Sequence, residues 1–312
     1  MDSMREALSQ NSYSSKRMTR LGSDRMREIY VKSVLNRHKR RDLWFLDDYS
    51  INPYTGCQYN CVYCYIHGSR YGRGGELAVK VNSPNILEKQ LSRAKRLERY
   101  GFISISSATE AWQLAEERYE VTRRCLEVIK RHRFPVHCLT KSPLILRDLD
   151  ILEEIDKRAI LPDDLKIVGR GTLITFSLST IDPEISRIFE PGAPSPLERL
   201  KTLKEVRDAG FKAGVAYIPV LPFISDGEEE LERMIGVAKE FGADYIFVGA
   251  LTLYGSGKEL YYRVLGRYFP EYLPKYERLY SGRGEPTLSY RRKLETISRR
   301  ICVEKNVRYM II

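Results

Sequence analysis

Short apolar runs alternate with helical stretches from about residue 48 onward, and this alternation limits the fold more than any other feature of the sequence. The runs are rich in β-branched and aromatic residues, which favour strands. A further strand is expected just before Cys57. Six strands that alternate with helices predict parallel βα units. The five apolar runs cover residues 102–105, 136–140, 174–178, 215–220 and 245–248.

Helix boundaries are predicted from capping residues. Residues 83–84 (Ser-Pro) are expected to begin one helix, with the serine as its N-cap. Residues 195–198 (Ser-Pro-Leu-Glu) predict a capping box, and residues 226–229 (Asp-Gly-Glu-Glu) are expected to begin a third helix in similar fashion. Gly210 and Gly242 stand where helices should end.

Three cysteines close together indicate a metal centre. Cys57, Cys61 and Cys64 have C-x3-C-x2-C spacing, and no fourth cysteine follows nearby. Three thiolates leave one iron of a [4Fe–4S] cluster without a protein ligand, so that iron can bind a small molecule. The alternative is structural zinc, which requires four ligands, with His67 as the fourth. A disulfide framework is disfavoured because six cysteines in 312 residues are few.

The residues around these cysteines resemble a known family. The C-x3-C-x2-C loop with an aromatic residue, Tyr63, before its last cysteine is the signature of radical S-adenosylmethionine (SAM) enzymes. The wider pattern is similar to the spore photoproduct lyase-like branch, whose members are often labelled DNA repair photolyases. The resemblance covers roughly residues 48–250, with matching stretches at 52–65, 139–148, 177–182 and 190–200.

The resemblance implies an α/β fold, a partial (β/α)6 TIM-like barrel of the radical SAM type. We expect three regions: a basic N-terminal extension (1–45), the barrel core (46–253) and a helical C-terminal cap (254–312). The cap region contains seven tyrosines between residues 254 and 280, interleaved with basic residues. This pattern suits base stacking on nucleic acid. Aromatic stripes on helices more often form core, however, and the cap is the preferred interpretation.

The resemblance also implies a [4Fe–4S] cluster and SAM as cofactors, with the three cysteines holding the cluster. Sites in such barrels collect at the carboxyl ends of the strands. There, Lys141 is the expected partner of the SAM carboxylate, and the alternative is a lysine snorkelling at the barrel rim. Thr109 and Glu110 are expected to hold the SAM amino group. For Glu110 the alternative is an ordinary surface carboxylate.

Aromatic and hydroxyl side chains complete the site that the resemblance implies. Tyr63 is expected to pack near the adenine, and Ser177 to hydrogen-bond the ribose. Tyr65 is expected to act catalytically in a radical relay, although either tyrosine can instead fill the core. In such enzymes a reduced cluster cleaves SAM to a 5′-deoxyadenosyl radical that abstracts hydrogen from the substrate. A donor such as ferredoxin or flavodoxin would supply the electron.

One position departs from the pattern of the family. Ser107 stands where spore photoproduct lyase carries a cysteine that returns a hydrogen atom to its product, and a serine O–H bond is too strong for this step. Cys138 is expected to face the helices if Lys141 faces the mouth, because side chains alternate along a strand. Cys125 is expected in the core, and the sequence does not place Cys302. Repair of the photoproduct itself is therefore disfavoured.

The net charge of +11 is concentrated near the N-terminus. Such a segment can follow the phosphates of DNA or RNA, and the alternative is a solvated extension that binds nothing specific. Between residues 16 and 41 only Asp24 and Glu28 oppose ten basic residues. These are Lys16, Arg17, Arg20, Arg25, Arg27, Lys32, Arg37, Lys39, Arg40 and Arg41.

The remaining features favour a cytoplasmic enzyme that contacts no membrane. The longest apolar run, residues 245–253, is too short to span a bilayer, and no signal peptide is recognised. Unpaired thiols favour a reducing compartment. Three functions remain: a radical SAM enzyme acting on nucleic acid, in DNA repair or tRNA modification; a radical SAM enzyme acting on a protein, peptide or small molecule; and a non-catalytic iron–sulfur protein that binds nucleic acid.

Overall fold

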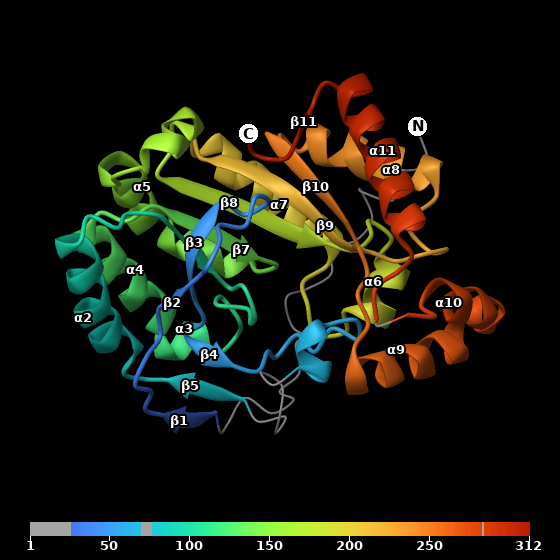
Figure 1. Ribbon diagram of the computed structural model, residues 1–312, viewed down its shortest axis with the longest axis horizontal. Coiled ribbons are helices and arrows are strands. Elements are labelled where there is room, and N and C mark those ends of the chain that lie inside the picture. The colour runs from blue at the N-terminus through green and yellow to red at the C-terminus, as the bar shows by residue number, and fades with distance from the viewer. Residues whose placement is uncertain (1–25, 70–76, 283) are drawn as a thin grey trace, which may run out of the picture.

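The computed structural model describes residues 26–69, 77–282 and 284–312 (Figure 1). In these residues the strands form two sheets. The larger has the order β11-β10-β9-β8-β7-β6-β3-β2, and the smaller has the order β1-β5-β4. The strands are β1 (Arg27–Ile29), β2 (Asn36–Arg37), β3 (Asp47–Ile51), β4 (Tyr54–Thr55), β5 (Ala78–Lys80), β6 (Phe102–Ile105), β7 (Val136–Thr140), β8 (Thr172–Leu178), β9 (Lys212–Val220), β10 (Tyr245–Ala250) and β11 (Arg308–Tyr309).

The six strands expected from the sequence are β3 and β6 to β10, and they run parallel as predicted. β2 is added antiparallel to β3 at one edge, and β11 is added parallel to β10 at the other. Within the described residues these two edge strands are not paired with each other. The sheet therefore stays open, and the predicted partial barrel is confirmed.

Helices cover the outer face of the curved sheet, with α2, α4 and α5 on one side and α8 and α11 on the other (Figure 1). Strand residues such as Ile103 and Phe176 share one buried apolar cluster with helix residues such as Leu126 and Leu203. Burying each such side chain stabilises the fold by about 1.5–3 kcal/mol. No helix in the described residues combines the length and apolar character needed to cross a bilayer. The α-helices are α2 (Ser83–Arg96), α3 (Glu116–Tyr119), α4 (Val121–His132), α5 (Leu149–Arg158), α6 (Pro183–Phe189), α7 (Pro196–Asp208), α8 (Glu228–Glu240), α9 (Gly255–Tyr268), α10 (Leu273–Leu279) and α11 (Leu288–Glu304).

Two helix starts test the capping predictions. The capping box at the start of α7 is present: Ser195 N donates to Glu198 Oε2 at 2.8 Å, and Glu198 N donates to Ser195 Oγ at 3.3 Å. The cap predicted at Ser83 is wrong by one position, because the N-cap of α2 is Asn82. The Asn82 amide does not cap the helix. It exchanges two hydrogen bonds of 2.9 Å with the backbone of Val31.

The predicted start of α8 is also displaced. The Asp226 carboxylate does not cap this helix; it accepts hydrogen bonds from Phe223 N and from the Tyr290 hydroxyl, both at 2.7 Å. The contact with Tyr290 comes from α11, 64 residues away, and no local pattern reveals it. Gly210 and Gly242 do follow helices, as predicted. Each has a φ of 88°, the left-handed backbone conformation that commonly ends an α-helix.

The region after β10 is helical, as predicted. α9 packs against the short 3-10 helix η1 (Tyr65–Gly68), which follows the cysteines. Tyr261, Tyr276 and Tyr280 are fully buried in an apolar cluster that also contains Cys61 and Tyr63. These tyrosines are therefore core residues, and the cysteine segment packs against them. α11 then returns to pack against α8 and β10.

Part of the basic segment is built into the sheets. Lys16, Arg17, Arg20 and Arg25 lie outside the described residues. In the described part, β1 pairs with β5 in the smaller sheet, and β2 pairs with β3 at the edge of the barrel. Residues 27–29 and 36–37 are therefore strands of the two sheets.

Candidate active site

The segment that carries the three cysteines is anchored to the turn after α6. Val62 N donates to Phe189 O at 2.8 Å, and Gly192 N donates to Tyr59 O at 3.1 Å. A Cβ at Gly192 would lie 2.8 Å from the backbone oxygen of Gln58, closer than a side chain tolerates. Glycine is therefore required for this close approach.

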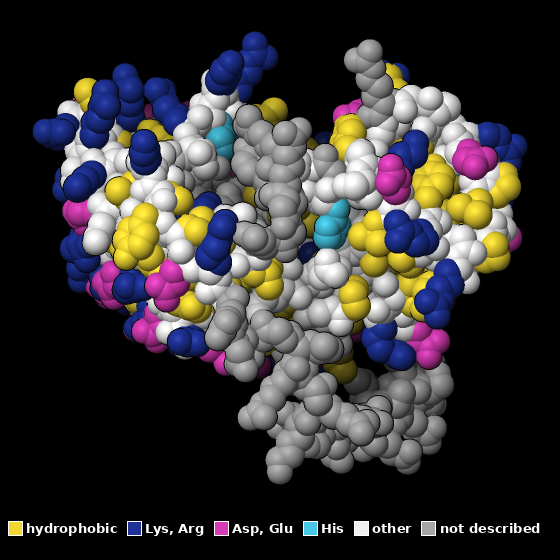
Figure 2. Space-filling model, turned by 90° about the horizontal axis from the view of Figure 1, so that it is seen from below, with side chains coloured by type: hydrophobic (Ala, Val, Ile, Leu, Met, Phe, Trp, Pro, Cys, Tyr) yellow, Lys and Arg dark blue, Asp and Glu magenta, His cyan; other side chains and the backbone are white. Residues whose placement is uncertain are grey.

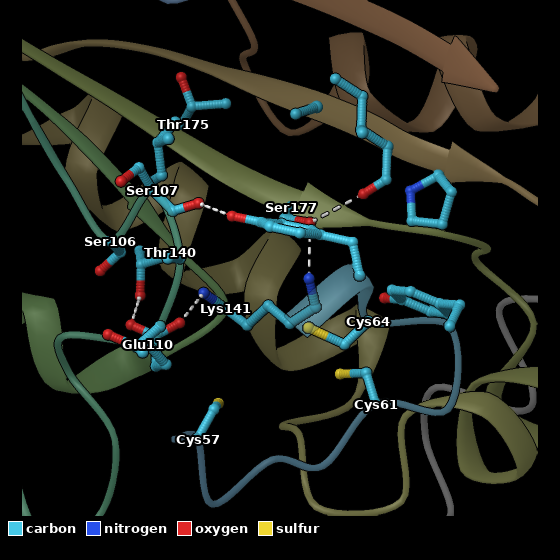
Figure 3. A pocket seen from close by; sticks show the side chains of 18 of the residues that line it. Cys57, Cys61, Cys64, Ser106, Ser107, Glu110, Thr140, Lys141, Thr175 and Ser177 are labelled. Atoms are coloured by element: carbon cyan, nitrogen blue, oxygen red, sulfur yellow. Dashed lines mark hydrogen bonds between the residues drawn. The ribbon is translucent and has the colours of Figure 1, made fainter. Parts of the chain in front are cut away.

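The three thiols are directed toward one space at the mouth of the barrel (Figure 3). Burial raises the pKa of Cys57 to about 11, and the nearby Glu110 carboxylate adds to this effect. Burial also raises the pKa of Cys61 and of Cys64, so a bound metal must displace protons. The space belongs to a cavity of about 320 Å³ that every site residue predicted from the sequence helps to line: Cys57, Cys61, Cys64, Tyr63, Tyr65, Thr109, Glu110, Lys141 and Ser177.

These thiols fit an iron–sulfur cluster better than a single zinc ion. Among the described residues, no group of three or more His, Cys, Asp or Glu is placed to hold one metal ion. His67, the alternative fourth zinc ligand, has its Nε2 in a hydrogen bond of 3.0 Å with the backbone oxygen of Cys61. Three thiolates around one larger space suit a [4Fe–4S] cluster with one iron left for a small molecule.

Glu110 joins the loop after β6 to the end of β7. Its Oε1 accepts a hydrogen bond from Thr140 Oγ1 at 2.7 Å, and its Oε2 accepts one from Lys141 N at 2.8 Å (Figure 3). The same Oε1 also accepts from Trp112 N at 3.0 Å. Burial raises the pKa of Glu110, and these donors oppose the rise. Since a carboxylate offers about four acceptor sites, capacity remains for the amino group predicted to bind here.

Asn52, directly after β3, holds the loop that presents Thr109. Its Oδ1 accepts hydrogen bonds from Ala108 N at 2.8 Å and Thr109 N at 3.2 Å, and its Nδ2 donates to Ser107 Oγ at 3.0 Å. This residue was not predicted from the sequence. Its position directly before Pro53 was the available signal, but its partners lie more than 50 residues away.

Lys141 is directed into the cavity beside the cysteines (Figure 3). Its Nζ donates to Ser177 Oγ at 2.6 Å and lies 4.0 Å from Glu190 Oε1. The same Nζ lies 5.9 Å from the centroid of the Tyr63 ring. A carboxylate is a stronger partner for an ammonium group than a hydroxyl is, so the predicted SAM carboxylate can replace Ser177 as the partner.

A buried ion pair lies beneath Lys141, and it was not predicted from the sequence. The side chains of Glu190 and Arg199 are completely buried, and Arg199 Nη2 donates to Glu190 Oε2. The Tyr63 hydroxyl donates to Glu190 Oε1. Burial alone would raise the pKa of Glu190, but Arg199 and Lys141 hold it at about 2. The carboxylate is therefore ionised, and it links α7 to the cysteine loop through Tyr63.

Tyr65 and Ser107 lie in direct contact. The Tyr65 hydroxyl donates to the backbone oxygen of Ser107 at 2.6 Å (Figure 3). Tyr65 is 45% exposed, so it is not a core residue. The residue predicted to relay a radical thus touches the residue that stands in place of the lyase cysteine.

The three other cysteines lie outside the cavity lining. Cys138 and Cys125 are fully buried in the apolar cluster between the sheet and the outer helices, as predicted. Leu139 and Lys141, on the opposite face of β7 from Cys138, do line the cavity. Cys302, which the sequence did not place, is buried on α11.

Comparison with known families identifies the chemistry of this cavity. The model of the family described as the radical SAM superfamily matches residues 51–235, more than half of the chain. The chain belongs to the radical SAM superfamily. Membership implies a [4Fe–4S] cluster and SAM as cofactors, and this protein is a radical SAM enzyme.

Relatives of this radical SAM enzyme occur in bacteria and archaea. The chain is 29% identical over 262 residues to an uncharacterized protein of Mycobacterium tuberculosis (strain ATCC 25618 / H37Rv), covering 81% of this chain and 73% of the relative. It is 28% identical over 204 residues to an uncharacterized protein of Methanocaldococcus jannaschii, covering 64% of this chain and 69% of the relative.

Solved structures of spore photoproduct lyase share the fold. One variant of the lyase matches with a TM-score of 0.67 at 18% identity, covering 91% of this chain and 81% of the lyase. Another, with bound AdoMet and dinucleoside spore photoproduct, matches with a TM-score of 0.64 at 19% identity, covering 85% and 76%. At these identities the match establishes the fold, and the expected spore photoproduct lyase-like architecture is confirmed.

Proposed function

We propose that this radical SAM enzyme acts on nucleic acid, in DNA repair or tRNA base modification. The observation that carries the proposal is the excess of basic residues within 16–41, where ten Lys or Arg face two acidic residues in a chain of net charge +11. Lys and Arg side chains lie on both sides of the face seen in Figure 2, with Asp and Glu side chains among them. A polyanion is the partner that such a charge distribution attracts. A lyase of the same fold binds a dinucleoside photoproduct, which supports this substrate class.

The residues at the mouth of the barrel have distinct proposed tasks. Cys57, Cys61 and Cys64 would hold the cluster, and Lys141 with Glu110 would orient SAM by its carboxylate and amino group. When bound, the cluster and SAM supply one-electron chemistry that amino-acid side chains lack. We propose a ferredoxin or flavodoxin as the reductant.

Removing residues 1–25 tests the proposed partner without cutting into β1. We expect weaker binding to DNA or RNA oligonucleotides and a shallower fall of affinity with salt. Each lost phosphate contact should reduce the slope of log K against log salt by about 0.9 for duplex DNA or 0.7 for single strands. Fluorescence anisotropy measures the affinity and its salt dependence, at salt concentrations between about 50 and 200 mM.

A matched control keeps the chain length and replaces only Lys16, Arg17, Arg20 and Arg25 by glutamine. It should weaken binding at least as much as the truncation, because it removes four positive charges and keeps the acidic residues that the truncation also removes. Both variants should keep the wild-type melting temperature. Unchanged affinity and slope in both would contradict a role for this segment in nucleic-acid binding.

Ser107 predicts that the reaction differs from photoproduct reversal. With dinucleotide spore photoproduct as substrate, the wild-type enzyme should not restore two thymines, because a serine hydroxyl does not return a hydrogen atom. Ser107→Cys should gain detectable reversal, since it places a thiol on a cavity-lining residue whose backbone oxygen contacts the Tyr65 hydroxyl. Chromatography of the product measures reversal by the wild type and by Ser107→Cys. Cys138→Ala is the control. Efficient reversal by the wild type would show the interpretation of Ser107 to be wrong.

A further inference from the structure

The lumen of the partial barrel is lined by polar side chains on some strands and by apolar side chains on others. Side chains alternate along each strand, so every second residue of the sheet faces the lumen. On β3, β6 and β8 the cavity is lined by Asp47, Ser104 and Thr175, and on β7 and β9 by Leu139, Ala216 and Ile218. A molecule that enters past the cysteines therefore meets both polar and apolar groups.

The inner end of this lumen is closed. Trp44 and Phe247 stack with ring centroids 6.1 Å apart, and Phe45 packs edge-on against Phe247 at 5.6 Å. Buried Phe102 and Leu173 belong to the same apolar cluster as Phe247. The cavity is therefore a blind pocket that opens at the cysteine-bearing mouth.

Most polar groups near this end already have partners. The ring of His137 is fully buried, and its Nδ1 lies 2.8 Å from Phe45 O and its Nε2 2.6 Å from Thr175 Oγ1. Thr175 Oγ1 also lies 2.8 Å from the Tyr245 hydroxyl. Burial lowers the pKa of His137 to about 4, so the ring is neutral. These groups form a satisfied network.

Two polar atoms that face the lumen are not part of this network. Asp47 Oδ1 and Ser104 Oγ are buried and make no hydrogen bond within the described residues, and the two side chains are 4% or less exposed. His38 Nδ1 lies 3.3 Å from Asp47 Oδ1, but its hydrogen bond goes to the backbone oxygen of Asp47. Buried polar groups in folded proteins are almost always paired. The Asp47 carboxylate, with His38 as its ion-pair neighbour, and the Ser104 hydroxyl therefore keep hydrogen-bonding capacity for a ligand in this pocket.

We propose that Asp47 and Ser104 form a recognition subsite that binds the N–H edge of a nucleobase inserted into the lumen. The inference rests on the proposed nucleic-acid substrate. An ionised carboxylate only accepts hydrogen bonds, whereas a hydroxyl both donates and accepts, so the pair matches an imide or amino-carbonyl edge. The apolar side chains of Ala216 and Ile218 would contact the face of the base, as in pockets that receive an extruded base.

The test compares base discrimination with overall affinity. The probes are short single-stranded oligonucleotides that differ only in one central base, each titrated at pH 8 into the full chain loaded with cluster and SAM. The wild type should prefer one central base by about tenfold or more. Asp47→Asn should remove that preference while leaving the affinity for the disfavoured probes unchanged, because phosphate contacts do not depend on it. Asp48→Asn is the neighbouring control and should keep the preference.

Ser104→Ala gives a second, independent readout. Removing an unpaired buried hydroxyl should leave the ligand-free melting temperature equal or higher, while base preference falls. A wild type that binds all probes equally, or an Asp47→Asn variant that keeps the preference, would overturn the subsite and leave the proposed substrate class intact. If no oligonucleotide binds although SAM is still cleaved, the nucleic-acid proposal itself fails. Binding of a peptide in this lumen would likewise overturn the assignment.

Discussion

Replacing Cys57, Cys61 or Cys64 by alanine is expected to abolish both the iron–sulfur absorbance and the formation of 5′-deoxyadenosine. Each thiolate would hold one iron of the cluster, and among the described residues no group of three or more Cys, His, Asp or Glu offers a second metal site. The fourth iron has to stay open for SAM. Loss of one thiolate would leave a second iron without a protein ligand, and we expect the cluster not to be retained. Iron and sulfide content after anaerobic reconstitution, followed by chromatography of the SAM products, measures the effect.

The matched control is Cys125→Ala, which also removes a buried thiol but lies on the core-facing side of α4. It should retain full iron content and activity, at a stability cost of about 1 kcal/mol. Wild-type iron content and SAM cleavage in any one of the three cluster variants would refute the assignment of that cysteine. Cluster formation without 5′-deoxyadenosine in the wild type would instead favour a binding or sensing role.

The barrel could be predicted because each strand and helix has a local signal. The strand runs at residues 102–105 and 136–140 coincide with β6 and β7 as the structure has them. Alternation along β7 also correctly assigns Lys141 to the cavity and Cys138 to the face covered by helices. These inferences depend on side-chain direction within one strand, which the sequence order determines.

Features that depend on contacts between distant segments were missed. Asp226 and Asn82 have side chains suited to helix caps, but tertiary partners bind them instead. The residues Asp47 and Ser104 become neighbours of one cavity only when β3 and β6 enclose the lumen. A serine within the apolar run at residues 102–105 was the visible signal, and it has meaning only once the strand is known to face a cavity.

The ion pair between Glu190 and Arg199 was the largest omission, and it predicts a large loss of stability. Glu190→Gln should lower the free energy of unfolding by about 3–5 kcal/mol, because it leaves the Arg199 guanidinium charged and buried without its counter-ion. Urea unfolding of the cluster-free protein at pH 7 measures this loss. Glu184→Gln, which breaks the exposed pair with Arg187, is the control and should cost at most about 1 kcal/mol.

The pH dependence of the same pair gives a second check. Arg199 and Lys141 overcome the effect of burial and hold the pKa of Glu190 at about 2, below the value of about 4.3 expected in the unfolded chain. A depressed pKa stabilises the folded state fully above the unfolded pKa, and this stabilisation is lost as the pH falls toward 2. The difference in unfolding free energy between wild type and Glu190→Gln should therefore be constant from pH 8 to about pH 5 and shrink below about pH 4.3. A difference that does not change on acidification would mean that the loss does not come from the charge of Glu190. In that case Tyr63 and the cysteine loop would be held in place by the hydrogen bonds that both carboxylate oxygens accept, one of which the amide of glutamine cannot accept.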